Sequence, residues 1–231
     1  MQPSSSASRL RWLGAELLVI VLGVLVALWF DGVRERRSDL EDETLLLSAL
    51  AAEVAENRRR LDRQFEWYQG RDAAQRELLS RATSGIQLPA DSLDLLWRWT
   101  LRGGTYDPAD GALSATFAAG QFRLLRDDAL RLRLGQWPGR TANVSGVEAQ
   151  YNAVLDGALF PLLKSEFSLP TGVADRDIPG PSSVSSLAAA LEDERVISHI
   201  RHLIYIGETL RIVADAELYP MLDSLEAQLR R

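Results

Sequence analysis

"LEDETLLLSALAAEVAENRRRLDRQFEWY", residues 40–68, decides the fold of this chain. Apolar side chains recur in it every seven residues, at Leu40, Leu47, Val54, Leu61 and Tyr68. Others fall on the same side of a helix: Leu46, Leu50, Ala51, Phe65, Leu78 and Leu79. Because no glycine or proline stands between Val33 and Gln69, the pattern predicts one long amphipathic helix, continuous with the apolar segment before it.

The intermediate positions of this repeat are polar. They are occupied by Glu43, Asn57, Gln64 and Arg71. A two-stranded coiled coil needs apolar residues at such positions, since they face the partner helix. We therefore expect this helix to pack within a helical bundle.

The rest of the chain is also predicted to be helical, which makes the fold class all-α. After a stop at Gly85, the expected helices run from Asp91 to Leu101, around 112–119, from Asp127 or Asp128 past Leu134, through 141–167, and through 187–229. The segment "LWRWTL" alternates like a strand, but its helical surroundings favour a helix.

Glycine and proline residues predict where these helices end or bend. Gly120 suits a left-handed helix end, while Pro161 and Pro220 are expected to bend the helices that contain them. Residues 168–186 are rich in Pro, Gly, Ser and Asp, which predicts an exposed loop.

Composition excludes several classes of function. The 231 residues carry a net charge of −6, which gives no general attraction for nucleic acids. The absence of cysteine excludes disulfides, thiolate metal sites and cysteine nucleophiles. The rest of the composition is ordinary for a globular protein, and its apolar excess is concentrated near the N-terminus.

That apolar excess, "GAELLVIVLGVLVALWF" at residues 14–30, predicts a membrane span. Counted from Leu17 to Phe30, the segment covers about 21 Å and is short for a bilayer, like the core of a signal peptide. Counted from Leu13, it covers about 27 Å, provided that Glu16 reaches back to the headgroups. We expect Trp12 and Trp29 to be interfacial anchors.

An uncleaved span divides the chain into an N-terminal tail (1–12), a transmembrane helix (13–30) and a helical soluble domain (31–231). Cleavage is disfavoured because bulky Trp29 and Phe30, not small residues, follow the apolar core. The acid-rich flank after the span favours a cytoplasmic N-terminus and a domain on the outer side of the membrane.

One face of the predicted span carries Glu16, Ile20, Gly23 and Ala27. A small residue at every fourth position lets a second helix approach closely, so this face is a candidate for self-association or for binding another membrane protein. The alternative is that these small residues have no particular role, as in many single spans.

The chain resembles an uncharacterised bacterial family of single-span membrane proteins. The resemblance rests on Glu16-Leu17-Leu18-Val19, on Gly23-x-Leu25-x-Ala27-Leu28, on Arg34-Glu35-Arg36-Arg37, and on Ala119-Gly120-Gln121-Phe122-x-Leu124-Leu125 followed by Leu130 and Leu134. The chain departs from that pattern in having Ala119 where serine is usual and Asp31 where asparagine is common. The resemblance implies a helical domain on one membrane helix, and no activity. With the predicted orientation, a bacterial origin places the helix in the inner membrane and the domain in the periplasm.

No catalytic constellation is found in the sequence. His199 and His202 share a helix face but lack nearby carboxylates at metal-binding spacing, and the adjacent acids Asp127 and Asp128 suit a helix cap. We therefore expect neither enzyme activity nor a cofactor or metal. The predicted function is a membrane-anchored interaction or scaffold module, as an accessory subunit of a membrane assembly.

Two alternatives stay open. One is a ligand-sensing helical domain with no output domain of its own, using a pocket lined by Trp67, Tyr68, Trp97, Trp99 or Trp137, although core packing is the plainer interpretation of these residues. The other is an ion-coupled single-span subunit that uses Glu16.

Overall fold

The computed structural model describes the backbone of residues 6–167 and 184–230, with the side chains of 6–15, 17–20 and 184 excepted. Every regular element among these residues is helical and none is a strand, which confirms the predicted all-α bundle. The predicted loop at 168–186 lies outside the described residues except for 184–186, which begin a helix.

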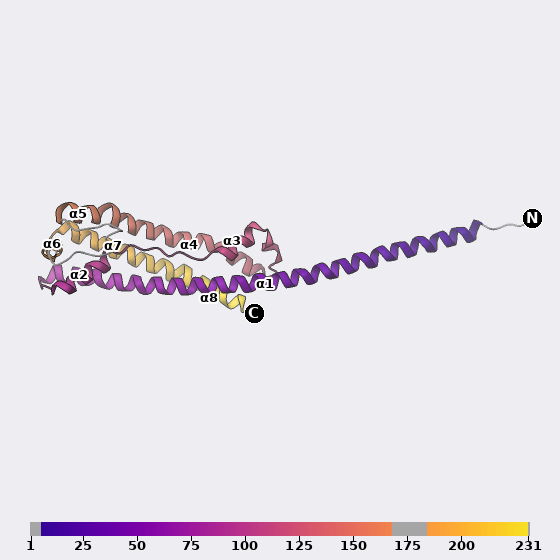
Figure 1. The fold of residues 1–231 in the computed structure, drawn as a ribbon, viewed down its shortest axis with the longest axis horizontal. Coiled ribbons are helices and arrows are strands. Elements are labelled where there is room, and N and C mark those ends of the chain that lie inside the picture. The colour runs from indigo at the N-terminus through magenta and orange to yellow at the C-terminus, as the bar shows by residue number, and fades with distance from the viewer. Residues whose placement is uncertain (1–5, 168–183, 231) are drawn as a thin grey trace, which may run out of the picture.

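The first helix, α1 (Ser6–Ser84), is 79 residues long and runs without interruption, as predicted. Figure 1 shows its N-terminal part projecting from the molecule and its C-terminal part lying along the whole bundle. It ends at Gly85, which has a φ of 66° and donates its N–H to the carbonyl of Arg81. Leu40 is 44% exposed whereas Val54, Leu61 and Tyr68 are buried, so the bundle begins after Leu40.

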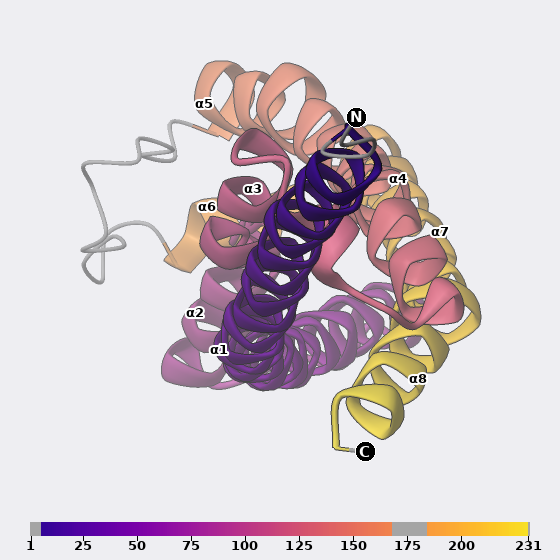
Figure 2. The same ribbon diagram turned by 90° about the vertical axis from the view of Figure 1, so that its right-hand side faces the viewer.

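Of two further long helices, α7 (Glu194–Val213) packs against both α1 and α4 (Asp128–Val154), and α4 meets α1 through side-chain hydrogen bonds such as that of Tyr68 to Glu148. Seen end-on in Figure 2, the three surround a common axis, and shorter elements close the remaining side. The shorter elements are α2 (Ala90–Thr100), α3 (Gly111–Ala118), η1 (Gln121–Leu124), α5 (Phe160–Phe167), α6 (Val184–Ala190) and α8 (Tyr219–Leu229).

The core is divided into two apolar clusters along the bundle. One surrounds Leu61 and Trp137 near the point where α1 leaves the bundle, and the other surrounds Trp97 and Ile200 at the far end. Both draw residues from α1, α4 and the C-terminal helices, so burial of their apolar surface ties the beginning of the chain to its end.

An extended segment, residues 101–110, lies along α1 between α2 and α3. Asn57 of α1 donates its Nδ2–H to the carbonyl of Ala109 at 2.8 Å and accepts the N–H of Ala109 on Oδ1 at 2.6 Å. Arg60 donates to the carbonyl of Asp107, and the carboxylate of Glu53 accepts the N–H groups of Ala112 and Leu113. These bonds supply partners for backbone groups that have none in regular structure.

The surroundings of the polar repeat positions on α1 explain why these positions are not apolar. Glu43 accepts the N–H of Arg126, Asn57 holds Ala109, and the amide nitrogen of Gln64 lies about 3.0 Å from where a Cβ on Gly104 would sit. Arg71 is buried among aromatic rings. We call Glu43, Asn57, Gln64 and Arg71 the polar seam.

The boundaries of the later helices differ from the predictions. The helix predicted past Leu134 and the one predicted from residue 141 are a single helix, α4, which runs through Pro138 and buries Leu134, Trp137 and Val144 on one face. Asp91 was expected as an N-cap, but α2 begins at Ala90 after Pro89. Asp127 does cap α4, accepting the N–H groups of Ala129 and Leu130, and Gly120 is left-handed as predicted.

The predicted helix 187–229 is interrupted at residues 191–193, between α6 and α7, where Asp193 accepts the N–H of Arg195 and caps α7. The predicted helix 141–167 is instead the later part of a helical run that begins at Asp128. A π turn precedes each proline: η2 (Leu155–Leu159) before Pro161 and η4 (Ala214–Leu218) before Pro220. Phe160 N–H bonds to the carbonyl of Leu155, and Tyr219 N–H bonds to that of Ala214, five residues back in each case. The wider turn makes room for a proline ring that clashes with the preceding turn of a regular helix.

The two π turns share a sequence pattern, "VLDGALFPLL" at 154–163 and "VADAELYPML" at 213–222. In both, the leucine before the aromatic residue and the second residue after proline are buried: Leu159 and Leu163, and Leu218 and Leu222. The same local solution to an internal proline thus occurs twice in this chain.

Replacement of Asn57 by alanine tests the hold on the extended segment. Because both backbone groups of Ala109 then lose their partner, we expect Asn57→Ala to lower the free energy of unfolding by about 2–4 kcal/mol. Urea unfolding followed by circular dichroism measures this change. The exposed Gln150→Ala on α4 is the control and should shift stability by less than about 0.5 kcal/mol; equal effects of the two substitutions would contradict the role of Asn57.

Candidate functional site

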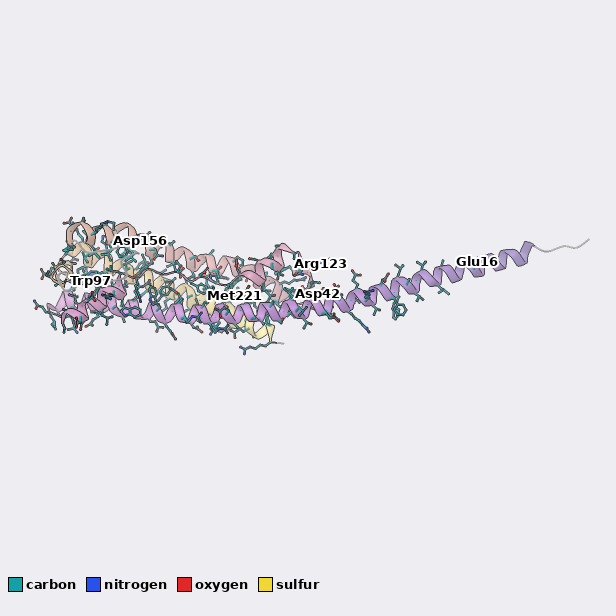
Figure 3. The ribbon with its side chains drawn as sticks, in the orientation of Figure 1. Glu16, Asp42, Trp97, Arg123, Asp156 and Met221 are labelled. Carbon is teal, nitrogen blue, oxygen red and sulfur yellow. The ribbon has the colours of Figure 1, made fainter. Side chains whose placement is uncertain are left out.

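The candidate site is the part of α1 that projects beyond the bundle, residues 6–42, which we call the arm (Figures 1 and 3). Between residues 21 and 30 its large apolar side chains are 48–64% exposed: Val21, Leu22, Val24, Leu25, Val26, Leu28, Trp29 and Phe30. None of them belongs to either core cluster. A contiguous apolar surface of this kind marks an interaction site.

The structure places the predicted face of the span on this arm. Glu16 is exposed, and Figure 3 shows it near the N-terminal end. Gly23 and Ala27 lie one helical turn apart and are exposed, and a Cβ built on Gly23 would meet no atom within 4 Å. This part of the face is therefore open to another helix. The side chains of Trp12 and Ile20 lie outside the described residues.

Trp29, the second predicted anchor, is exposed and packs edge-on against Phe30, with ring centroids 5.1 Å apart. A charged segment follows it, from Asp31 to Asp42, in which Val33 and Leu40 are the large apolar residues. The bundle begins at Glu43, whose carboxylate accepts the backbone N–H of Arg126 at 2.9 Å and lies 3.2 Å from its guanidinium. The apolar surface and the bundle are thus separated by a polar stretch of the same helix.

A second uncovered surface lies on the outer side of α4, where small residues alternate at spacings of four and three: Gly135, Gly139, Ala142, Gly146, Ala149 and Ala153. All six are exposed, and a Cβ on any of the three glycines would meet no atom within 4 Å. The sequence analysis missed this strip, although the spacing of its small residues was a visible signal.

The interior holds a cluster of titratable groups centred on Glu148, which is 1% exposed. Its Oε1 accepts the hydroxyl of Tyr68 at 2.5 Å and the backbone N–H of Tyr106 at 2.8 Å, while its Oε2 has no partner among the described residues. Burial raises the pKa of Glu148, opposed by these two hydrogen bonds and by the charge of Arg71. Burial, and then Glu148 itself, raises the pKa of Tyr68.

Arg71 lies in the same cluster and is 2% exposed. Its guanidinium carbon is 3.6 Å from the ring centroid of Tyr151 and 4.6 Å from that of Tyr68, and its Nε has no partner in the described chain. Burial lowers the pKa of Arg71, and the aromatic faces stabilise its charge. The cluster joins α1, α4 and the extended segment, so its role in the fold is to hold these three together.

The other residues that the sequence singled out are spread through the bundle. Trp97 and Trp137 are buried in different core clusters and Tyr68 bonds to Glu148, so these aromatic residues do not line one common pocket. Within the described ranges, no three His, Asp or Glu side chains are grouped as a metal site around His199, His202 or elsewhere.

The raised pKa of Glu148 predicts a pH dependence. A carboxyl whose folded-state pKa exceeds its unfolded value near 4.5 stabilises the fold fully below that value and loses this contribution as pH rises through the folded pKa. We expect the free energy of unfolding, taken as wild type minus Glu148→Gln, to fall as pH rises above about 4.5, by about 1.4 kcal/mol per unit of pKa elevation.

Urea unfolding of both proteins between about pH 4 and pH 8 measures this difference. Glu66→Gln, at an exposed position of α1, is the control: the difference in free energy of unfolding between wild type and this variant should change much less with pH. A difference for Glu148→Gln that stays constant or rises with pH would show that burial does not dominate at this carboxyl.

Over the residues that the structure describes, no helix contains an apolar stretch long enough to cross a bilayer. The predicted span at 13–30 includes residues 13–15 and 17–20, whose side chains lie outside the described part. Comparisons with protein-family models, with curated proteins and with solved structures find no match to this chain. The family resemblance and the membrane span therefore both stay predictions.

Proposed function

We propose that this protein is a membrane-anchored interaction module, in which residues 13–30 of the arm lie in a bilayer and the bundle stands at its surface as an accessory part of a membrane assembly. One observation carries the proposal. Eight large apolar side chains at 21–30 are uncovered, while the bundle beside them has a core of its own. Lipid is the first partner, since it covers all sides of a helix at once.

The layout of the arm supports this placement. Its apolar residues are followed at once by the charged segment 31–42, so polarity changes where a helix leaves the hydrocarbon. Trp29 stands at this boundary and is 64% exposed, as an interfacial anchor requires. We further propose a bacterial inner membrane, with the N-terminus in the cytoplasm and the bundle in the periplasm, from the acid-rich flank and the family resemblance.

The interaction role is supported by surfaces that the chain leaves uncovered. Within the arm, Gly23 and Ala27 allow a second helix to approach, either from another copy or from another membrane protein. Outside the arm, the strip of small residues on α4 is equally open. Because α1 is one helix from arm to bundle, a partner bound in the membrane also positions the bundle above it.

Arginine substitutions in the arm test the anchor. Leu25→Arg with Leu28→Arg changes two exposed positions, so the bundle should stay folded. Each arginine costs about 2.5–3.5 kcal/mol at the centre of a membrane helix, so we expect the pair to lower partition into liposomes more than about 100-fold. Liposome flotation of the full chain measures partition.

The matched control is Leu132→Arg with Ile212→Arg, which places the same charges at exposed apolar positions of the bundle. This variant should float with liposomes as the wild type does. A wild-type protein that stays out of the lipid fraction, or arm and bundle variants that behave alike, would refute the membrane anchor.

A separate experiment tests the interaction role. Gly23→Leu with Ala27→Leu fills the open face of the arm without adding charge, so lipid binding should persist. Chemical crosslinking in membranes, followed by purification in mild detergent, should then show loss of the partner or of the dimer. A wild-type chain that crosslinks to nothing would remove the interaction role while leaving the anchor intact.

A further inference from the structure

A cavity of about 260 Å³ lies between the extended segment, α3 and α4, apart from the arm and from the buried cluster around Glu148. Its apolar lining comes from Pro108, Leu113, Phe117, Trp137 and Pro138. Asp107 and Asp110 contribute two exposed carboxylates, and none of the described residues that line it is basic. We propose that this cavity binds a small organic cation, of the ammonium or guanidinium class.

The charge of the cavity supports a cationic ligand. In the described chain, neither Asp107 nor Asp110 has an ion-pair partner within 4 Å; Asp110 accepts the hydroxyl of Ser114 at 3.1 Å. Arg60 donates to the backbone carbonyl of Asp107 and its charge also interacts with the Asp107 carboxylate, but its guanidinium is paired with Glu56 at 2.9 Å. Both carboxylates are therefore available to a ligand.

The aromatic lining favours the same class. A cation is attracted to the faces of tryptophan and phenylalanine, most strongly where water is partly excluded. Trp137 is 4% exposed and lines the cavity together with Phe117. A few polar groups above an apolar floor are the usual composition of a small-molecule site.

The walls are held in place before any ligand arrives. Asn57 makes both of its hydrogen bonds to Ala109, between the two acidic residues, and Glu53 binds the first turn of α3. On the opposite wall, the hydroxyl of Thr141 donates to the backbone carbonyls of Trp137 and Pro138. Such preorganisation lowers the entropic cost of binding.

Benzamidine and benzamide form a matched pair of probes, because they share size and shape but only benzamidine is charged. We expect the full chain in mild detergent to bind benzamidine at least about tenfold more tightly than benzamide, as a calorimetric titration measures. Benzamidine should also shift the indole N–H resonance of Trp137, which Trp137→Phe identifies. Equal affinities, or a resonance that does not move, would overturn the proposal.

Substitutions at the two acids locate the site. Asp107→Asn with Asp110→Asn should weaken benzamidine binding about tenfold or more, and asparagine at 110 still suits the start of a helix. Asp156→Asn removes a carboxylate at the far end of the bundle (Figure 3) and should leave affinity within about twofold. Loss of binding in both variants alike, or in neither, would contradict the site.

If the double variant does not fold, Ser114→Lys tests the location of the site instead. Its lysine places a positive charge at an exposed position beside the cavity, so it should also weaken benzamidine binding. Two further probes separate the sources of the cation. Binding of n-butylguanidinium alone indicates a free small molecule, whereas binding of a backbone-blocked arginine as well indicates a side chain of a partner protein. Failure of both would overturn the proposal, and none of these results depends on membrane anchoring.

Discussion

The pairing of Asn57 with the backbone of Ala109 is the contact on which the arrangement of the bundle depends. In the described chain, residues 103–109 make no backbone hydrogen bonds of regular structure, so their path beside α1 depends on partners supplied by side chains. On α1, Asn57, Arg60 and Tyr68 supply them, and Glu53 does the same for the first turn of α3. One face of α1 therefore carries two functions: leucines that build the apolar clusters, and polar groups that fix the path of a non-helical chain.

The sequence predicted the helices better than it predicted what lies between them. The seven-residue repeat from Leu40 to Tyr68 predicted α1. A bundle, and not a two-stranded coiled coil, was predicted from the polar residues Glu43, Asn57, Gln64 and Arg71. What those polar groups bind was not predictable, because Asn57 meets a backbone 52 residues away and local pattern carries no such information. The course of the chain at its prolines was also not predictable in detail: α4 continues through Pro138, where its neighbours are buried on one face, and a π turn accommodates Pro161.

The candidate sites were predictable to different degrees. The arm was visible as an apolar run, since exposure of that run follows from its lying outside the repeat that forms the core. The cavity was not visible, because Asp107, Asp110, Phe117 and Trp137 come together only when the extended segment is fixed beside α4. The two proposed roles, recognition by the arm and small-molecule binding by the bundle, therefore concern separate parts of the chain.

The unbroken course of α1 has a geometric consequence. Residues 31–42 make no contact with either core cluster, yet they set the rotational phase between the arm and the bundle. Adding one residue there turns the bundle by about 100° about the helix axis and moves it by about 1.5 Å. Adding seven residues nearly restores the angle and lengthens the charged segment by about 10 Å. The length of the charged segment thus sets both the distance between the arm and the bundle and the direction in which the bundle faces.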